Sequence, residues 1–186
     1  MEARGYKMRP GDSAPSFALP GVDGKTHRLE DYKGARALVI AFWCNHCPYV
    51  QAYEKRTIDL ARQYKDRGVQ FLLINSNEVE NYPEDDFPHM VKRAIEKNYP
   101  FPYLRDADQK VAEAYGAQCT PHFFLFDTSG YLRYQGRLDD NKDLAEAVKR
   151  HYLEDAIKAV LAGRNPTEPE SWAIGCSIKW TKTATA

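Results

Sequence analysis

Two cysteines stand three positions apart in FWCNHCPYV, residues 42–50, with a histidine between them and a proline directly behind. Such a pair can bind a metal, form a structural disulfide or perform redox chemistry as a dithiol. A structural zinc site normally takes four protein ligands, and the sequence holds no second Cys-x-x-Cys and no His-x-x-x-His. The four cysteines are too few for a disulfide-stapled scaffold. We therefore predict a redox-active pair at Cys44 and Cys47, with no metal.

The cysteine pair needs a rigid junction to position it. The continuous apolar run RALVIAFW, residues 36–43, is typical of a strand covered on both faces, and the cysteines follow its C-terminal end. Beyond them, apolar residues recur at spacings of three and four from residue 50 to residue 64, and Gly68 follows. This spacing predicts a helix of several turns with a glycine stop. The pair therefore lies between a strand and a helix.

That junction decides which thiol is the more reactive. Backbone N–H groups and the dipole at the first turn of a helix favour a thiolate, which is the reactive form of cysteine. We expect Cys44, the upstream member, to be the nucleophile. Cys47, one turn further along, is close enough to close a small disulfide ring. We expect Cys47 to be the less exposed, resolving thiol.

The other elements follow from hydrophobic periodicity and turn residues, and their order predicts the fold class. Strand, helix, strand, helix, hairpin and helix in succession indicate an α/β domain with a central mixed β-sheet flanked by helices. The further predicted elements are an N-terminal β-hairpin within residues 10–35, a strand at 69–77, helices at 84–97 and 110–116, an antiparallel hairpin at 122–137 and a closing helix at 142–162.

Three segments make up the predicted domain organisation. Residues 1–9 form an N-terminal segment, residues 10–162 a single domain, and residues 163–186 a C-terminal tail. The tail begins with the proline-rich stretch GRNPTEPE and continues with SWAIGCSIKW, which is too apolar to remain free. We expect it to pack back on the domain in extended form.

Charge and hydropathy argue against several classes of partner. The chain carries 26 basic and 26 acidic residues, so no overall field attracts nucleic acid or an anionic membrane. Its N-terminus lacks the apolar core of a secretory signal, and the longest apolar run, residues 37–43, is too short to cross a bilayer. We expect a soluble, cytoplasmic protein that binds neither nucleic acid nor membranes.

The motifs WCNHCP and TPHFFLFD resemble the two signature elements of the thioredoxin superfamily. These elements are a Trp-Cys-x-x-Cys motif before an amphipathic helix and a cis-proline before a hairpin strand. The resemblance covers roughly residues 10–162 and implies a thioredoxin fold. Residues 11–34 further resemble the branch that holds peroxiredoxins and the thiol-disulfide reductases of cytochrome c maturation. GCSIKW resembles the ending of a bacterial subgroup of that branch.

This resemblance implies a thiol-disulfide oxidoreductase with no metal or organic cofactor. Cys44 and Cys47 become its redox pair and Trp43 the ring beside them. Thr120 and Pro121 become the cis peptide, whose backbone pairs with an extended substrate chain. The implied partners are protein disulfides or dithiols, together with a reductant such as a thiol or a reductase.

Two further positions carry expectations about the pair. His46 matches the histidine of the more oxidising disulfide isomerases, which implies that its imidazolium stabilises the Cys44 thiolate. The alternative for His46 is a bystander at the start of the helix. Thioredoxins place a buried aspartate in the strand before the motif, where this chain has Ala41 or Leu38. Glu78, after the neighbouring strand, is a candidate proton acceptor in its place. The alternative for Glu78 is an exposed loop carboxylate.

The alternatives to an oxidoreductase are a peroxiredoxin-like thiol peroxidase and a non-enzymatic metal- or partner-binding module. Peroxiredoxins carry an arginine where this chain has Pro121, and a threonine before the reactive cysteine that is missing here. For Cys119 and Cys176 we favour packing over a further redox role. His122 has two equal interpretations, a side chain near the dithiol or one pointing away from it.

Overall fold

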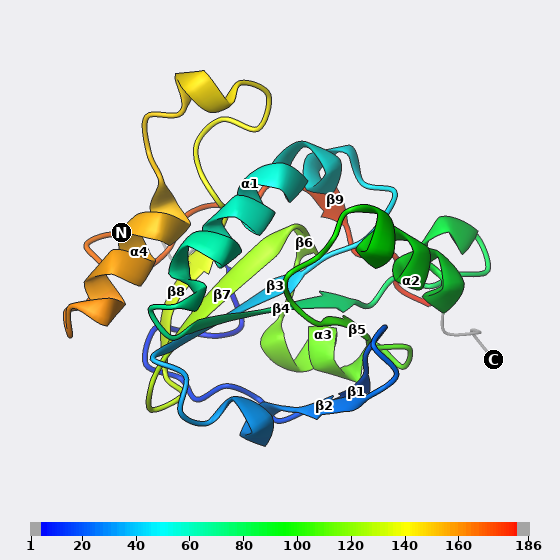
Figure 1. The fold of residues 1–186 in the computed structure, drawn as a ribbon, viewed down its shortest axis with the longest axis horizontal. Helices are drawn as coiled ribbons and strands as arrows, with labels where there is room; N and C mark the ends of the chain where they lie inside the picture. The colour runs from blue at the N-terminus through cyan, green and yellow to red at the C-terminus, as the bar shows by residue number, and fades with distance from the viewer. Residues whose placement is uncertain (1–4, 182–186) are drawn as a thin grey trace.

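A five-stranded mixed sheet forms the centre of the fold in the computed structural model, which describes residues 5–181 (Figure 1). Residues 1–4 of the predicted N-terminal segment and 182–186 of the predicted tail lie outside the described residues. In sheet order the strands are β5 (Tyr103–Arg105), β4 (Val69–Asn75), β3 (Ala37–Phe42), β7 (His122–Asp127) and β8 (Leu132–Gly136).

The middle strand, β3, is parallel to β4 and antiparallel to β7. Every residue of β3 is buried, as its continuous apolar sequence predicts. Its side chains alternate between two core clusters, with Val39 and Ala41 in one and Ile40 and Phe42 in the other. Both faces of the sheet are therefore covered, and the predicted α/β class with a central mixed sheet is confirmed.

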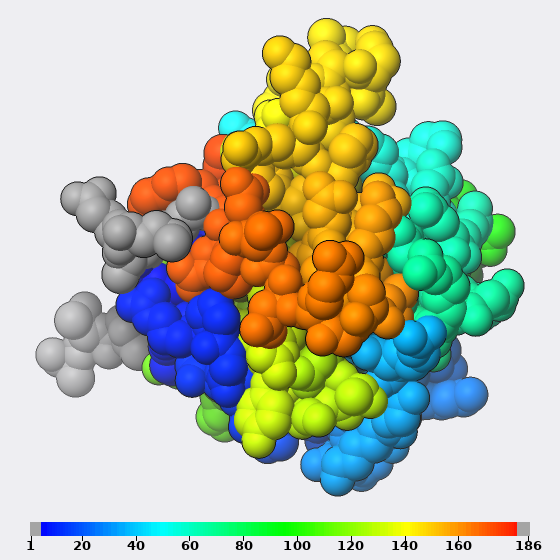
Figure 2. Space-filling model, turned by 90° about the vertical axis from the view of Figure 1, so that its left-hand side faces the viewer, coloured from blue at the N-terminus to red at the C-terminus, as the bar shows by residue number. Residues whose placement is uncertain are grey.

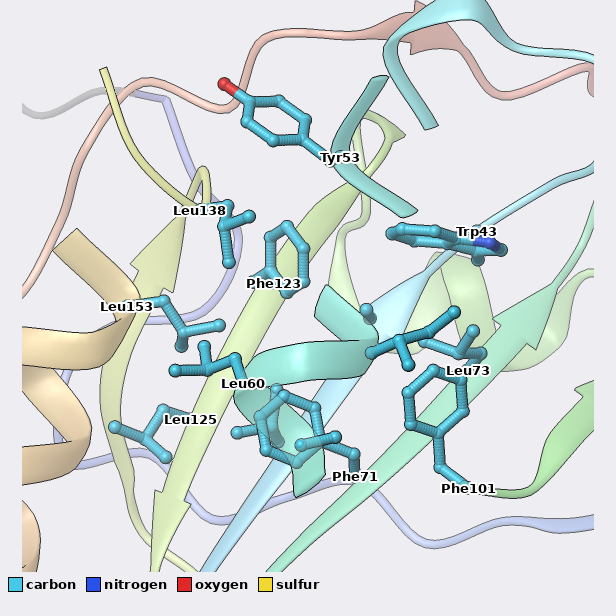
Figure 3. Packing of buried hydrophobic residues seen from close by; sticks show 14 of the residues in the cluster. Trp43, Tyr53, Leu60, Phe71, Leu73, Phe101, Phe123, Leu125, Leu138 and Leu153 are labelled. Carbon is cyan, nitrogen blue, oxygen red and sulfur yellow. The ribbon is translucent and has the colours of Figure 1, made fainter. Parts of the chain in front are cut away.

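The helices cover these two faces unequally. In the first cluster, Leu60 and Leu153 approach Leu125 of the sheet (Figure 3). The second cluster lies against the short third helix and the N-terminal residues.

None of the helices in the described part of the chain is long and apolar enough to cross a membrane. The α-helices of residues 5–181 are α1 (Pro48–Lys65), α2 (Phe87–Glu96), α3 (Lys110–Tyr115) and α4 (Tyr152–Leu161).

Two small sheets lie outside the central one. The predicted N-terminal hairpin is present, with β1 (Ala18–Pro20) antiparallel to β2 (Thr26–Arg28). The second small sheet joins segments far apart in the sequence, because β6 (Cys119–Thr120) pairs antiparallel with β9 (Cys176–Ser177) of the tail (Figure 1). The tail thus reaches the end of the sheet where the cysteine pair lies.

The prediction of one closing helix over residues 142–162 is wrong. Only α4 and a short 3-10 turn, Ala145–Ala147, are helical there, and residues 140–150 project from the body of the molecule (yellow in Figure 2). The Asp140 carboxylate accepts hydrogen bonds from the backbone N–H groups of Lys149 and Arg150, which folds the segment back on itself. Leu144, which falls within the predicted helix, is 53% exposed.

His122 points away from the cysteine pair. Its ring lies between Tyr6 and Phe124, with ring centroids 5.1 and 4.3 Å away. The residue is fully buried, and among the described residues its Nε2 has no hydrogen-bond partner. Burial lowers the pKa of His122 to about 3, so the imidazole stays neutral in the folded protein.

This neutral histidine predicts a specific loss of stability in acid. Below about pH 6.5 the unfolded chain protonates His122 while the folded chain does not, so stability falls by about 1.4 kcal/mol per pH unit down to about pH 3. His122→Phe removes that term. Between pH 7 and pH 5, we expect the variant to lose about 2 kcal/mol less unfolding free energy than the wild type in denaturant titrations.

Exposed His151→Phe is the matched control and should keep the wild-type pH dependence. If His122→Phe and the wild type lose the same free energy between these pH values, His122 is already protonated or hydrated in the folded state.

Candidate active site

The cysteine pair lies where β3 gives way to α1, and the helix begins later than the sequence suggested. Pro48 is the first helical residue and Cys47 is the N-cap, so Cys44 precedes the helix rather than standing in its first turn. Pro48 fits this position because the first helical N–H has no intrahelical partner. Both Cys44 and Cys47 are fully buried, so the expected difference in exposure is absent.

Thr120 meets both sulfur atoms. Its hydroxyl oxygen lies 3.2 Å from Cys44 Sγ, and its carbonyl oxygen lies 3.1 Å from Cys47 Sγ. The peptide bond from Thr120 to Pro121 is cis. Trp43 is buried next to the pair, packs edge-on against Phe123, and donates its indole N–H to Tyr99 at 3.3 Å. The residues that the sequence motifs named are therefore brought together.

A third thiol completes the cluster. Cys176 Sγ lies 2.7 Å from Cys47 Sγ, and Cys176 is partly exposed where the other two cysteines are buried. The sequence favours packing for Cys176, because nothing in its local sequence reveals that β9 pairs with β6. Cys119 does behave as a core residue: its Sγ lies 3.6 Å from the Pro121 carbonyl oxygen, and burial raises its pKa to about 12.

The surroundings of the pair favour a thiolate on Cys47. The Cys44 thiol, the Cys176 thiol and the backbone N–H of Val50 lower the pKa of Cys47, against the opposing effect of burial. The Thr120 carbonyl oxygen beside Cys47 Sγ, like burial, disfavours ionisation of Cys47, but the three hydrogen-bond donors outweigh both effects. The pKa of Cys44 is raised by its hydrogen bond to Cys47, by burial and by the Asp85 carboxylate. The thiolate therefore lies at the helix start, as its dipole dictates.

Asp85 is the carboxylate beside the pair, and the sequence analysis missed it. It is fully buried and accepts hydrogen bonds from Asn45 N (2.6 Å), Asn77 Nδ2 (2.7 Å) and His46 Nδ1 (2.6 Å). The His46 ring stacks on Tyr82 with centroids 5.2 Å apart. An acidic residue in the 3-10 turn Pro83–Asp85 carries no local signal of this burial.

Glu78 does not take the position expected of it. Its carboxylate accepts hydrogen bonds from the backbone and side chain of Asn81, in its own loop. These hydrogen bonds hold the Glu78 carboxylate to its own loop, whereas Asp85 is the carboxylate whose charge acts on the Cys44 thiol. We therefore replace Glu78 with Asp85 as the candidate proton acceptor.

Three potential metal ligands lie close together at the site. Ligand atoms of Cys44, His46 and Asp85 fall within 4.8 Å of one another. Structural zinc normally takes four protein ligands, and this group has three within residues 5–181. The Asp85 oxygens already accept three N–H groups of the chain, so the arrangement fits a hydrogen-bonded carboxylate better than a metal ligand.

Comparisons with known proteins agree with this chemistry. Residues 10–135 match the model of the AhpC/TSA family. The chain is 30% identical to the thiol-disulfide oxidoreductase ResA of Geobacillus thermodenitrificans, over 76% of this chain and 75% of the relative. It is 34% identical to peroxiredoxin Bcp of Escherichia coli, over 68% of this chain and 84% of the relative.

Solved structures match the fold. An uncharacterized conserved protein from Geobacillus kaustophilus is 46% identical, with a TM-score of 0.90 over 96% of both chains. A putative thioredoxin from Neisseria meningitidis is 28% identical, with a TM-score of 0.57 over 67% of this chain and 79% of that one. The fold is a thioredoxin fold, as the resemblance implied.

The proton distribution within the pair is open to direct titration. We expect the ultraviolet absorbance of the reduced protein to show one thiolate that persists below the usual pKa of a cysteine thiol. Cys47→Ser should abolish this low-pH transition, and Cys44→Ala should raise its midpoint because a donor to Cys47 is lost. Buried Cys119→Ser is the control. A low-pH thiolate that survives Cys47→Ser would assign it to Cys44.

The charge of Asp85 should lower the reduction potential of the pair. Reduction of the disulfide creates the Cys47 thiolate, a negative charge in the same buried site as the Asp85 carboxylate. Their repulsion disfavours the reduced form, so Asp85→Asn stabilises that form and raises the potential. A pKa change of one unit corresponds to about 30 mV. Equilibration in redox buffers followed by thiol alkylation measures the shift. Asp86→Asn is the matched control, because asparagine caps α2 as well as aspartate does. An unchanged potential in Asp85→Asn contradicts the assignment.

Proposed function

The chain belongs to the AhpC/TSA family, and on that premise we propose that it is a thiol-disulfide oxidoreductase that exchanges disulfides with protein partners. Its working group is the dithiol of Cys44 and Cys47, and it needs no metal or organic cofactor. The observation that carries the proposal is the contact of both sulfur atoms with Thr120. One of the two thiols also lies in surroundings that favour its ionisation.

The tail supports a particular position for the substrate. A substrate chain can pair with Thr120 in the same way as β9. The substrate residue opposite Thr120 then has its side chain at the Cys47 sulfur, where Cys176 lies in the free protein. A disulfide sulfur held there faces the Cys47 thiolate directly. This position favours Cys47 as the attacking thiol, the reverse of the order that the sequence suggested.

The reaction then follows ordinary thiol-disulfide exchange. The Cys47 thiolate attacks one substrate sulfur, and the other leaves as a thiolate that takes up a proton. Cys44 loses its proton and attacks Cys47, which breaks the mixed disulfide and releases the second substrate thiol. The substrate disulfide has gained two electrons, and Cys44 and Cys47 are joined in a disulfide. A small thiol or a reductase must return the electrons.

Asp85 and His46 are the groups proposed to assist Cys44. Their hydrogen bond of 2.6 Å joins a buried carboxylate to an imidazole that is partly open to solvent. Through this pair, the proton that Cys44 loses can pass outward when Cys44 attacks. His46 would thus act on Cys44 through Asp85.

The assignment of the attacking thiol can be tested with single-thiol proteins. In a background of Cys119→Ser and Cys176→Ser, adding Cys44→Ser leaves Cys47 alone, and adding Cys47→Ser leaves Cys44 alone. We expect the Cys47-only protein to form stable adducts with a disulfide-containing protein such as insulin, released by added dithiol, because nothing resolves them. The Cys44-only protein should form at least tenfold fewer.

The same two single-thiol proteins also distinguish the alternative hypotheses about the attacking thiol and the function. Adducts through Cys44 alone restore the order predicted from the sequence while keeping the function. Absence of adducts from both proteins contradicts the function. A thiol peroxidase predicts instead that hydrogen peroxide converts one thiol rapidly to a sulfenic acid without a disulfide substrate.

A further inference from the structure

The tail strand occupies the edge at which a substrate chain is proposed to bind. In the pairing of β6 with β9, Thr120 lies opposite Cys176 and Cys119 lies opposite Ser177, in antiparallel register. The chain therefore supplies its own extended segment at this edge, and that segment carries a cysteine at the reacting position.

The approach of the tail to this edge is unusually close. A Cβ atom added at Gly175 would lie 2.1 Å from the Thr120 carbonyl oxygen and 2.6 Å from its carbon. No residue with a side chain fits there without displacing the strand. Glycine before Cys176 thus allows the sulfur to reach the buried thiols.

Both sides of the tail strand are anchored. Upstream, Ser171 donates its backbone N–H to the Gln135 carbonyl at 3.0 Å and accepts the Tyr6 hydroxyl at 2.6 Å. Downstream, Lys179 N donates to Asn77 Oδ1 and Gln109 Nε2 donates to the Lys179 carbonyl, both at 2.8 Å. Cys176 is therefore held at the pair by contacts spread over the domain.

The three thiols differ in access to solvent. Cys44 and Cys47 are 0% exposed, whereas Cys176 is intermediate. The separation of 2.7 Å between the sulfurs of Cys176 and Cys47 is shorter than the roughly 3–3.5 Å from which reacting atoms combine. An external thiol in this conformation reaches Cys176 before it reaches either member of the buried pair.

We propose that Cys176 is a third redox-active thiol that carries the disulfide from the buried pair to the surface. This inference deepens the proposed function and rests on it, because it starts from a disulfide between Cys44 and Cys47. The Cys176 thiol loses its proton and attacks Cys47 Sγ. A bond between Cys47 and Cys176 forms, the bond between Cys44 and Cys47 breaks, and Cys44 leaves as a thiolate that takes up a proton. No electrons enter or leave in this step.

Reduction is then completed at the surface by a low-molecular-weight thiol. One molecule attacks Cys176 Sγ, forms a mixed disulfide there and releases Cys47 as a thiolate. A second molecule attacks the mixed disulfide and restores the Cys176 thiol. Two external thiols have become one external disulfide, and the protein has returned to three thiols.

The first test maps the disulfides of the oxidised full-length chain. The protein is oxidised with diamide, quenched in acid, alkylated, digested and examined by mass spectrometry. In the wild type we expect peptides joined through Cys47 and Cys176. In Cys176→Ser we expect only the linkage of Cys44 to Cys47, and finding that linkage keeps the proposed function intact whatever the wild type shows. Wild-type protein that lacks the Cys47–Cys176 linkage overturns the inference.

The second test measures how fast excess glutathione reduces the oxidised proteins. Cys176→Ser keeps the tail in place, since a hydroxyl replaces the thiol, but removes the reactive sulfur. We expect its reduction to be at least tenfold slower than that of the wild type. Cys119→Ser, which alters the neighbouring buried thiol, should be reduced at the wild-type rate. An unchanged rate in Cys176→Ser shows that the tail only covers the site and overturns the inference.

Thermal unfolding of the variants guards against a trivial loss of structure. If Cys176→Ser unfolds at a markedly lower temperature than the wild type, Cys176→Ala serves as the second variant. The same slow reduction is expected of it, and reduction of Cys176→Ala at the wild-type rate also overturns the inference.

Discussion

The backbone and hydroxyl of Thr120 form the point at which three distant parts of the chain converge. Its hydroxyl contacts Cys44 and its carbonyl oxygen contacts Cys47. Its strand, β6, pairs with β9, the tail strand that contains Cys176. A shift of Thr120 would therefore separate the thiols from one another and from any strand that binds beside them. The two core clusters, by fixing β3 and β7 in register, hold this single residue in place.

Electrostatics then divide the roles of two chemically identical thiols. The N-terminus of α1 offers a backbone N–H to Cys47, while a buried carboxylate stands beside Cys44. A positive helix end at one sulfur and a negative charge at the other place the proton on Cys44. The Asp85 charge is itself tolerated in the interior because three N–H groups donate to it. The same hydrogen bonds that bury Asp85 thus direct the chemistry of the pair.

Much of this arrangement follows from local sequence. The apolar run before Cys44 specifies a strand covered on both faces, and the periodicity after Pro48 specifies α1. Pro48 marks the helix start, since proline favours the first helical position. That preference alone is enough to identify Cys47 as the N-cap. The failures are long-range. Burial of Asp85 depends on Asn77 and His46, and placement of Cys176 depends on a two-residue strand that no periodicity can reveal. The predicted helix over 142–162 failed because Asp140 caps a loop that closes nine residues later.

A tethered strand has consequences for substrate selection. Because β9 belongs to the same chain, it is present at its edge at a high effective concentration, of the order of millimolar for short flexible links. A protein substrate must displace it, and pairing with a two-residue strand offers little energy for this. Partners that compete successfully need contacts beyond the Thr120 edge, so recognition should extend to surfaces flanking the tail. When Cys176 is joined to Cys47 the strand is covalently fixed, and competition becomes possible only after reduction. The oxidised protein is thereby closed to a second substrate until a thiol has opened it, which gives disulfide exchange at this site an order of events.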